Sequence, residues 1–223
     1  MYRTTENTQK RKDEKKKMIL DAAAGVFSRK GYHNATVRDI VNEAAVSVGS
    51  FYFYFNSKED LFSELYRGIV KEFGDVTASV LDVEHFTMLK NFTRVMAATL
   101  WMYEQKRDIA RIVFSEMLTA EPSFKALEEE RINSFVQVMT GWFGRFKLHS
   151  GVNIPDEKAA ALIYAGSYQS LVSYWLKDGA GAPLTGLGYA FCVYNLQALG
   201  IAFNEPEVKE YIGEVLSELE LRL

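Results

Sequence analysis

The sequence predicts an all-α protein, with a small helix-turn-helix domain at its amino-terminal end and a larger helical domain after it. Three observations lead to this fold class. Apolar residues recur at three- and four-residue spacing along almost the whole chain, as in amphipathic helices. Three helix starts with a capping hydroxyl, at Thr36, Ser47 and Ser57, fall within 22 residues. The four prolines, Pro122, Pro155, Pro183 and Pro206, each lie near the boundary of a predicted helix.

The first 30 residues divide into a charged arm and a helix. Residues 1–12 are polar and rich in lysine, so we expect a disordered basic arm there. From Asp13 to Lys30 the apolar side chains share one helical face, and Gly31 is a suitable residue to end the helix. The apolar positions of this face are Ile19, Ala22, Ala23, Val26 and Phe27.

Two short helices and a long one are predicted next. Thr36, with Asp39 three residues later, has the pattern of a capped helix start. Ser47 caps a very short helix, about 48–53, and Ser57 caps a long helix that continues through Phe73. Short helix, tight connection and shorter helix form the helix-turn-helix pattern, although an ordinary helical hairpin has the same spacing. We place this domain at residues 13–56 and a second domain at 57–223.

The second domain is predicted to be helical throughout. Helices are expected at about 85–105, 107–119, 122–148, 156–177, 186–203 and 206–222. The connections between them are short and contain Gly, Pro, Asn or Asp. Internal repeats and low-complexity tracts are absent from the sequence.

Composition limits the function classes. Residues 1–67 hold 12 Lys and Arg against 9 Asp and Glu, whereas residues 68–223 hold 14 against 20, so a basic part precedes an acidic one. A single cysteine, Cys192, excludes an intrachain disulfide and a cysteine metal cluster, and is consistent with a cytoplasmic protein. The start of the chain lacks the apolar stretch of a secretory signal, and no apolar run is long enough to span a bilayer. The three histidines show no metal-ligand or catalytic-triad spacing, so we expect no enzyme, metal or cofactor.

Five consecutive aromatic residues, 51–55, are too dense for an ordinary core helix. If the short helix lies in a DNA major groove, its first turn faces the base edges. That turn consists of Ser47, Val48, Gly49 and Ser50. We then expect Phe51 and Phe55 to pack inward, and Tyr52 and Tyr54 to direct their hydroxyl groups to phosphates. Thr36 and Lys58, at two other helix starts, are further candidates for phosphate contacts.

The stretch 19–62 resembles the DNA-binding domain of the TetR family of bacterial transcriptional regulators. The matching pieces are A-x-x-x-F-x-x-x-G-Y, A-T-V-x-D-I, A-x-V-S-x-G-x-x-Y-x-Y-F and S-K-E-D-L, which together cover about 45 of the 223 residues. The resemblance implies a homodimer that binds a pseudo-palindromic double-stranded operator through its first three helices. It also implies that the remaining helices bind a small molecule and dimerise, and that the ligand usually relieves repression.

Three positions depart from the family pattern. Ala45 stands where the turn usually has Gly, Val48 replaces a residue that is often Lys, and Phe53 replaces a frequent His. The recognition helix therefore has no Arg, Lys, Asn or Gln for bidentate base contacts, so we expect phosphate contacts and DNA shape to carry much of the specificity. The same departures keep open an alternative, a helical protein-interaction module whose DNA-binding unit is degenerate.

The second domain has predicted surfaces for a partner subunit and for a ligand. The helices at about 156–177 and 186–203 are apolar over much of their surface, which favours a homodimer interface there over internal burial alone. One face of the first holds Tyr164, Ser167, Tyr168, Leu171, Val172 and Trp175, and another has the small residues Ala161, Ala165, Gly166 and Ser170.

A pocket for a hydrophobic effector is expected between the middle helices. The candidate lining residues are Trp101, Phe114, Glu116, Arg131, Phe135, Trp142, Tyr168 and Gln169. Arg131 and Glu116 are charges on apolar faces, and a buried charge is costly unless it is paired. Either these two residues pair with each other, or one of them contacts a polar group of the ligand.

Overall fold

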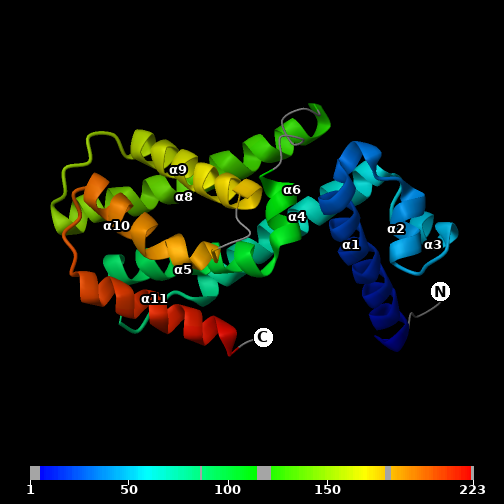
Figure 1. Ribbon diagram of the computed structural model, residues 1–223, viewed down its shortest axis with the longest axis horizontal. Helices are drawn as coiled ribbons and strands as arrows, with labels where there is room; N and C mark the ends of the chain where they lie inside the picture. The colour runs from blue at the N-terminus through cyan, green and yellow to red at the C-terminus, as the bar shows by residue number, and fades with distance from the viewer. Residues whose placement is uncertain (1–5, 86, 115–121, 179–181, 222–223) are drawn as a thin grey trace.

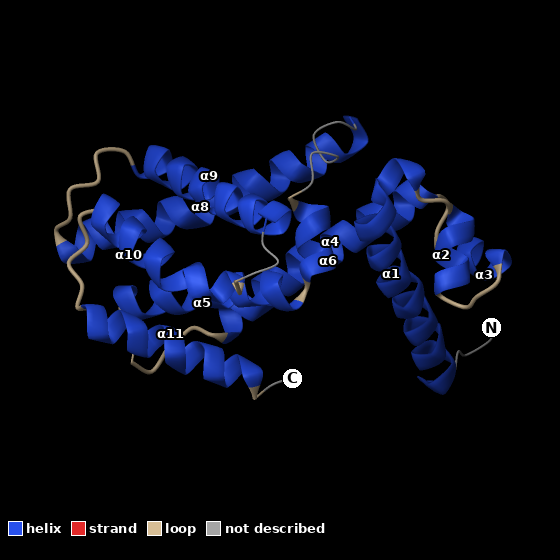
Figure 2. Ribbon diagram, in the orientation of Figure 1, coloured by secondary structure: helices blue, strands red, loops and turns tan. Residues whose placement is uncertain are grey.

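The structure is a computed structural model that describes residues 6–85, 87–114, 122–178 and 182–221. The described residues form helices and no strands, which confirms the predicted fold class (Figure 2). The elements are α1 Glu6–Asn34, α2 Val37–Glu43, α3 Val48–Tyr54, α4 Lys58–Ser79, α5 Met88–Gln105, α6 Arg107–Val113, α8 Pro122–Ser150, α9 Glu157–Asp178, η1 Leu184–Leu187, α10 Gly188–Ala198 and α11 Glu205–Glu220.

The molecule is elongated, and the helices gather at its two ends (Figure 1). Helices α1, α2 and α3 lie at one end, and α5 together with α8 to α11 lies at the other. Helix α4 runs between the two groups, so one continuous element joins the helix-turn-helix unit to the larger helical body.

Three boundaries differ from the sequence-based expectation. Residues 6–12 continue α1 instead of forming a disordered arm, because the segment has no Gly or Pro and Gln9 donates a hydrogen bond of 2.9 Å to Asp13 one turn later. The helix expected at 186–203 begins as a 3-10 turn and ends at Ala198. Gly200, at a φ of 67°, closes that end, with its N–H bonded to the carbonyl of Gln197 at 3.0 Å. The third is the helix expected at 107–119. Its described part is α6, which ends at Val113, and residue 114, and residues 115–119 lie outside the described ranges.

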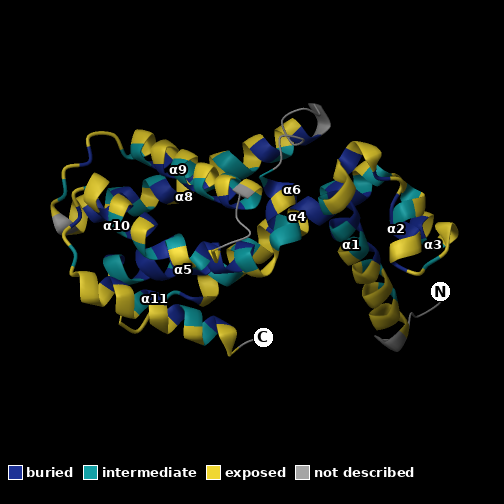
Figure 3. Ribbon diagram, in the orientation of Figure 1, coloured by how far each residue is buried: buried dark blue, intermediate teal, exposed yellow. Residues whose placement is uncertain are grey.

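The two ends of the molecule share one hydrophobic core (Figure 3). An aromatic cluster of Tyr32 in α1, Phe62 in α4 and Phe124 in α8 joins them, with ring centroids 4.3 to 5.3 Å apart. The Ser28 hydroxyl in α1 also donates a hydrogen bond of 2.5 Å to Asp108 in α6. Because packed cores transmit displacement, movement of α4 or α8 in the body reaches α1 directly.

Candidate DNA-binding surface and ligand cavity

Helix α2 begins with the predicted cap. The backbone N–H of Asp39 donates to the Thr36 hydroxyl at 3.1 Å, and the backbone N–H of Thr36 donates to the Asp39 carboxylate at 3.0 Å. Lys30 adds an ion pair to Asp39 at 2.7 Å. Hydrogen bonds from Lys30 and Thr36 lower the pKa of Asp39 to about 2, so this carboxylate holds the start of α2 at neutral pH.

In the turn between α2 and α3, a residue other than glycine adopts the left-handed conformation. Ala45 has a φ of 52°, and its N–H donates to the carbonyl of Asn42 at 3.2 Å. The N–H of Val46 then donates to the carbonyl of Val41 at 3.0 Å, which closes the end of α2. The departure from the family's usual glycine therefore leaves the turn geometry in place, at the cost of strain in an alanine.

The aromatic run divides between the core and the surface. Phe51 and Phe55 are fully buried, at 0% and 1% exposure, as predicted, and Tyr54 is half-buried. Tyr52 and Phe53 are exposed, at 56% and 66%. Phe53 was not among the predicted DNA-contact residues, because adjacency to Tyr52 does not fix its direction: Phe51, on the other side of Tyr52, is buried, and only the packing of α3 shows Phe53 to be outward.

The outward side of α3 begins at its cap. Ser47 accepts a hydrogen bond of 3.1 Å from the backbone N–H of Ser50, and Ser47, Val48 and Gly49 are all exposed. Val48 is 47% exposed although it is apolar. The structure thus brings the predicted base-facing residues onto one open surface, with the side chain of Ser50 partly covered.

Lys58 has protein partners at the position where a phosphate contact was predicted. Its ammonium group donates to the carbonyls of Tyr32 and Ala35 at 2.6 and 2.7 Å, and lies 4.2 Å from the ring centroid of Tyr32. Tyr32 lies in the last turn of α1, where helix carbonyls lack intrahelical donors, and Ala35 directly follows the end of that helix. The cation at the start of α4 is therefore accounted for by the end of α1, and a phosphate contact by Lys58 remains a prediction.

Basic residues of α1 lie beside α3. Lys12 places its ammonium group 5.5 Å from the ring centroid of Phe53, and Lys16 lies 5.6 Å from that of Phe55. Lys16 also pairs with Glu64 at 2.5 Å. The ordered start of α1 therefore holds positive charge next to the exposed surface of α3 (Figure 1).

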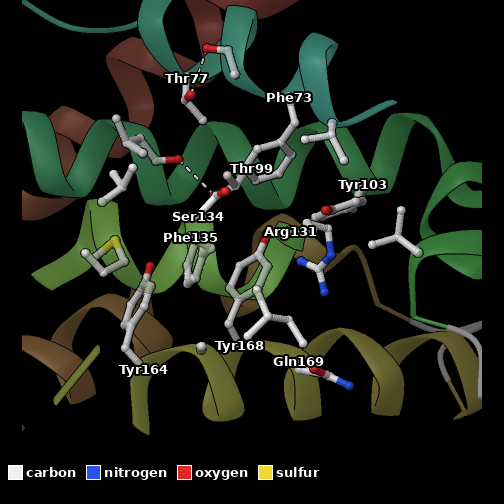
Figure 4. A pocket seen from close by; sticks show the side chains of 18 of the residues that line it. Phe73, Thr77, Thr99, Tyr103, Arg131, Ser134, Phe135, Tyr164, Tyr168 and Gln169 are labelled. Carbon is white, nitrogen blue, oxygen red and sulfur yellow. Dashed lines mark hydrogen bonds between the residues drawn. The ribbon is translucent and has the colours of Figure 1, made fainter. Parts of the chain in front are cut away.

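The body contains a partly open, apolar cavity of about 580 Å³ lined by residues of α4, α5, α6, α8 and α9 (Figure 4). Its size lies within the range of small-molecule sites. Six predicted residues line it: Phe114, Arg131, Phe135, Trp142, Tyr168 and Gln169. Lining residues that were not predicted include Phe73 and Thr77 of α4, Thr99 and Tyr103 of α5, and Ser134 of α8.

One predicted pocket residue, Trp101, does not line the cavity. Trp101 is buried but does not line it, because the lining positions Val95, Thr99 and Tyr103 lie on the opposite side of α5. Glu116 lies outside the described residues. The spacing of the α5 positions was visible in the sequence, but the side of the helix that faces the cavity depends on how α4 and α11 pack around it.

Arg131 has an ionic partner that the sequence reading missed. It binds Glu128, one turn earlier in α8, through two hydrogen bonds of 2.9 and 2.6 Å. Its Nε–H also approaches the hydroxyl oxygen of Tyr66 in α4 at 3.0 Å, and that hydroxyl donates to Glu128. Burial, the largest single influence, lowers the pKa of Arg131, but the hydrogen bonds to Glu128 together with the electrostatic interactions with Tyr66, Glu128 and Tyr103 leave the net pKa raised. The residue is therefore a charged member of a buried pair that ties α8 to α4.

Helix α9 turns its aromatic face inward. Tyr164, Tyr168 and Trp175, predicted as part of an interface face, are at most 7% exposed, because they pack within the chain. Tyr164 and Tyr168 contact the ring of Phe191 in α10 at 5.7 and 5.8 Å. The outer side of α9 instead exposes Ile163, Ser170 and Tyr174, and α10 exposes Tyr194.

The remaining candidate chemical groups are Cys192 and the His, Asp and Glu side chains of the described residues. Cys192 is fully buried 3.6 Å from the Thr93 hydroxyl, and burial raises the pKa of its thiol to about 11. Within the described ranges, no cluster of three His, Cys, Asp or Glu side chains has the arrangement of a metal site. None of the described helices has the length and apolar character needed to cross a membrane.

Comparison with known proteins matches the amino-terminal domain to a family model. Residues 19–65 match the model of "Bacterial regulatory proteins, tetR family". The chain is 34% identical over 104 residues to the uncharacterized HTH-type transcriptional regulator YdgC of Bacillus subtilis, which covers 45% of this chain and 53% of that protein. It is 41% identical over 68 residues to the HTH-type transcriptional repressor KstR2 of Rhodococcus jostii, covering 29% of this chain and 33% of that protein.

A solved structure extends the likeness of fold to most of the chain. The fatty acid degradation regulator FadR of Bacillus halodurans superposes with a TM-score of 0.76 and 22% identity, over 84% of this chain and 97% of that one. The chain spans about half or less of the length of the two curated relatives named above. The match at residues 19–65 is to the family whose DNA-binding motifs the sequence resembles.

Proposed function

We propose that this protein is a ligand-responsive, DNA-binding transcriptional regulator of the cytoplasm, and that it acts as a repressor released from its operator by an apolar small molecule. The observation that carries the proposal is the course of α4. One end of this helix packs in the core of the helix-turn-helix unit through Leu61, Phe62 and Leu65, and the other lines the cavity through Phe73 and Thr77. A molecule in the cavity therefore touches the element that positions the DNA-binding unit.

The proposed DNA surface is the exposed side of α3 with its flanking caps. It comprises Thr36, Ser47, Val48, Gly49, Ser50, Tyr52 and Tyr54, to which we add Phe53 because of its exposure. Serine hydroxyls and apolar contacts with thymine methyl groups read bases less selectively than bidentate Arg or Asn contacts. Basic residues of α1, including Lys12, add affinity that falls with salt concentration.

A homodimer through α9 and α10 completes the proposed assembly. A single α3 of seven residues offers few base contacts, whereas two copies about 34 Å apart read two half-sites of a pseudo-palindrome. Ile163 is 71% exposed, Tyr174 64% and Tyr194 62%, and large apolar groups at such exposure favour burial by a partner. The small residue Ser170 on the outer side of α9 allows close approach of a second helix.

Regulation in this proposal is a shift between two dimer conformations. The effector binds in the cavity and favours a position of α4 in which the two α3 helices are wrongly spaced for DNA. By reciprocity, operator DNA weakens effector binding by the same factor.

A gel-shift titration with the DNA upstream of the protein's own gene tests the function. Wild-type protein is expected to bind as a dimer, and Tyr52→Ala to weaken binding about tenfold, which corresponds to ~1.4 kcal/mol. Val83→Ala is the matched control, because Val83 is 79% exposed and lies outside the helix-turn-helix unit. Sedimentation of the same samples gives the oligomeric state.

The alternative function, a protein-interaction module with a degenerate DNA-binding unit, makes a different prediction in the same experiment. It requires that wild type and Tyr52→Ala show the same weak, sequence-independent DNA binding. The exposed Phe53 and Val48 on α3 are the observation that favours this alternative, since apolar surface also suits a protein partner.

A further inference from the structure

The inference concerns the chemistry of the effector, and it rests on the proposed function of the cavity. Arg131 is the only charged side chain among the described residues that line the cavity. A guanidinium has five N–H donors. Its bonds to Glu128 and Tyr66 use the Nε–H and one N–H of a terminal nitrogen. The other three N–H groups find no acceptor within the described part of the chain, so Arg131 offers donors to a molecule in the cavity.

A tyrosine hydroxyl of the cavity wall also lacks a partner. Tyr168 is 7% exposed, and its hydroxyl lies near Thr99 but makes no hydrogen bond of normal length and angle within the described residues. The neighbouring Tyr103 ring lies 6.2 Å away by its centroid. Burial raises the pKa of both Tyr103 and Tyr168, so both hydroxyl groups remain protonated at neutral pH. Figure 4 shows Tyr103, Arg131 and Tyr168 at one end of the cavity, separated from Tyr164 at the other.

The buried Tyr168 hydroxyl favours an acceptor because a buried donor without a partner is destabilising, and the partly exposed guanidinium of Arg131 offers further donors beside it. The rest of the cavity wall is largely apolar, with Phe73, Phe135 and Trp142 among its rings. The site therefore fits an apolar body that ends in an oxygen acceptor, placed against Arg131 and Tyr168.

The charge of the pair decides which acceptor fits. Glu128 and Arg131 are 2.6 Å apart, and their side chains are 8% and 19% exposed, so the guanidinium is already neutralised where it is buried. A carboxylate head group would leave one uncompensated negative charge in apolar surroundings, which is costly. A neutral carbonyl accepts the same hydrogen bonds without adding charge.

We propose that the effector is an apolar molecule with a neutral carbonyl acceptor, of the ester, thioester, amide or ketone class, and that Glu128 sets this preference by neutralising Arg131. Glu128 does not line the cavity itself. It is therefore a specificity-determining residue that acts through Arg131. A carboxylate ligand is disfavoured by its charge, and a hydrocarbon is disfavoured because it accepts no hydrogen bond.

Three probes of nearly equal shape test the proposal on the full-length protein without DNA. Acetylnaphthalene carries a neutral carbonyl, naphthoate a carboxylate, and isopropylnaphthalene no acceptor. Isothermal titration calorimetry at neutral pH is expected to give acetylnaphthalene at least a tenfold lower Kd than either of the others. Equal or tighter binding of naphthoate or isopropylnaphthalene overturns the proposal.

A charge variant tests the role of Glu128. In Glu128→Gln the guanidinium is no longer neutralised, so the preference is expected to invert in favour of naphthoate. Glu129→Gln is the matched control, because Glu129 is 61% exposed on the same helix and must leave the order of the probes unchanged. An unchanged order in a folded Glu128→Gln overturns the assigned role, and if that variant does not fold, the wild-type comparison still decides the ligand class.

The test separates this inference from the proposed function. If none of the probes binds, the cavity assignment and the ligand class both fall. If naphthoate binds best while operator DNA is still bound and released, the regulator stands and the neutral-carbonyl class is wrong. If acetylnaphthalene binds best but the protein ignores DNA, the ligand class stands and the regulator is wrong.

Discussion

The DNA-binding surface and the ligand cavity are built over very different distances along the chain. The surface lies on α3 and its flanking caps, between Thr36 and Tyr54, and each part is held by hydrogen bonds to residues three or four positions away. The cavity takes side chains from α4, α5, α8 and α9, from Ile69 to Gln169. Local contacts therefore shape the first site, whereas the second exists only when distant helices pack. Damage to one distant contact is expected to affect the cavity more than loss of one cap affects the surface.

The largest effect is expected from breaking the buried pair of the body. In Glu128→Ala the guanidinium of Arg131 stays buried without its counter-ion, so the free energy of unfolding should fall by about 3 kcal/mol. Urea denaturation followed by circular dichroism measures this loss. Glu129→Ala, on the exposed side of α8, should change stability by less than about 0.5 kcal/mol. Equal losses in the two variants would show that the pair is not buried in solution.

A smaller effect on stability, but a specific one on regulation, is expected for Tyr66→Phe. The change removes the hydroxyl that joins α4 to Glu128 and leaves the Glu128–Arg131 pair intact. Stability should fall by about 1 kcal/mol. Because α4 loses its polar link to the cavity wall, the factor by which a bound probe weakens operator affinity should approach one.

Gel-shift titrations with and without acetylnaphthalene measure the coupling in Tyr66→Phe. Tyr164→Phe is the control, because Tyr164 lines the same cavity from α9 and lies away from Arg131 in Figure 4. The link through Tyr66 is refuted when both variants retain the wild-type factor.

The same contrast explains which features the sequence could predict. Thr36 and Ser47 were identified as caps because a cap needs only a hydroxyl and the next turn of helix. Phe51 and Phe55 were correctly expected in the core, but the outward position of Phe53 needed the packing of α3 to be known. Residues 6–12 were expected to be disordered because their composition is polar and rich in lysine. Helix formation there depends instead on side-chain pairs along α1, which composition alone does not reveal.

The body was predicted less completely for a physical reason. Arg131 was recognised as a charge on an apolar face, but Glu128 was not considered as its partner, although it lies only three residues away. Tyr66 belongs to another helix, and nothing in its local sequence indicates that it contacts Arg131. The periodicity of α5 marks its apolar positions, yet both Trp101 and Tyr103 are buried and only Tyr103 faces the cavity. Which of the buried residues lines the cavity depends on how the helices pack together.

Acid pH should affect the amino-terminal surface through Asp39. The pKa of this carboxylate is lowered from its ordinary value of 3.8 to about 2, so its stabilising effect is fully present above about pH 4 and is lost as the pH falls toward 2. Asp39→Asn should therefore be less stable than wild type at pH 5, and the difference should shrink toward pH 2. A difference that grows with acidity would contradict the assigned hydrogen bonds. Paired thermal denaturation curves at several pH values measure it.

The smallest effect is expected at Ala45, and its sign is the informative part. A left-handed alanine costs roughly 1 kcal/mol, so Ala45→Gly relieves strain, while the greater freedom of glycine in the unfolded chain offsets part of the gain. The net result should be a stabilisation of about 0.5 kcal/mol, measured as a higher urea midpoint. Ala44→Gly is the matched control, because Ala44 is buried in a right-handed conformation at a φ of −76° and should be destabilised by about 1 kcal/mol. If both glycines destabilise the protein, the turn is not left-handed at residue 45, and the placement of α3 relative to α2 must be revised.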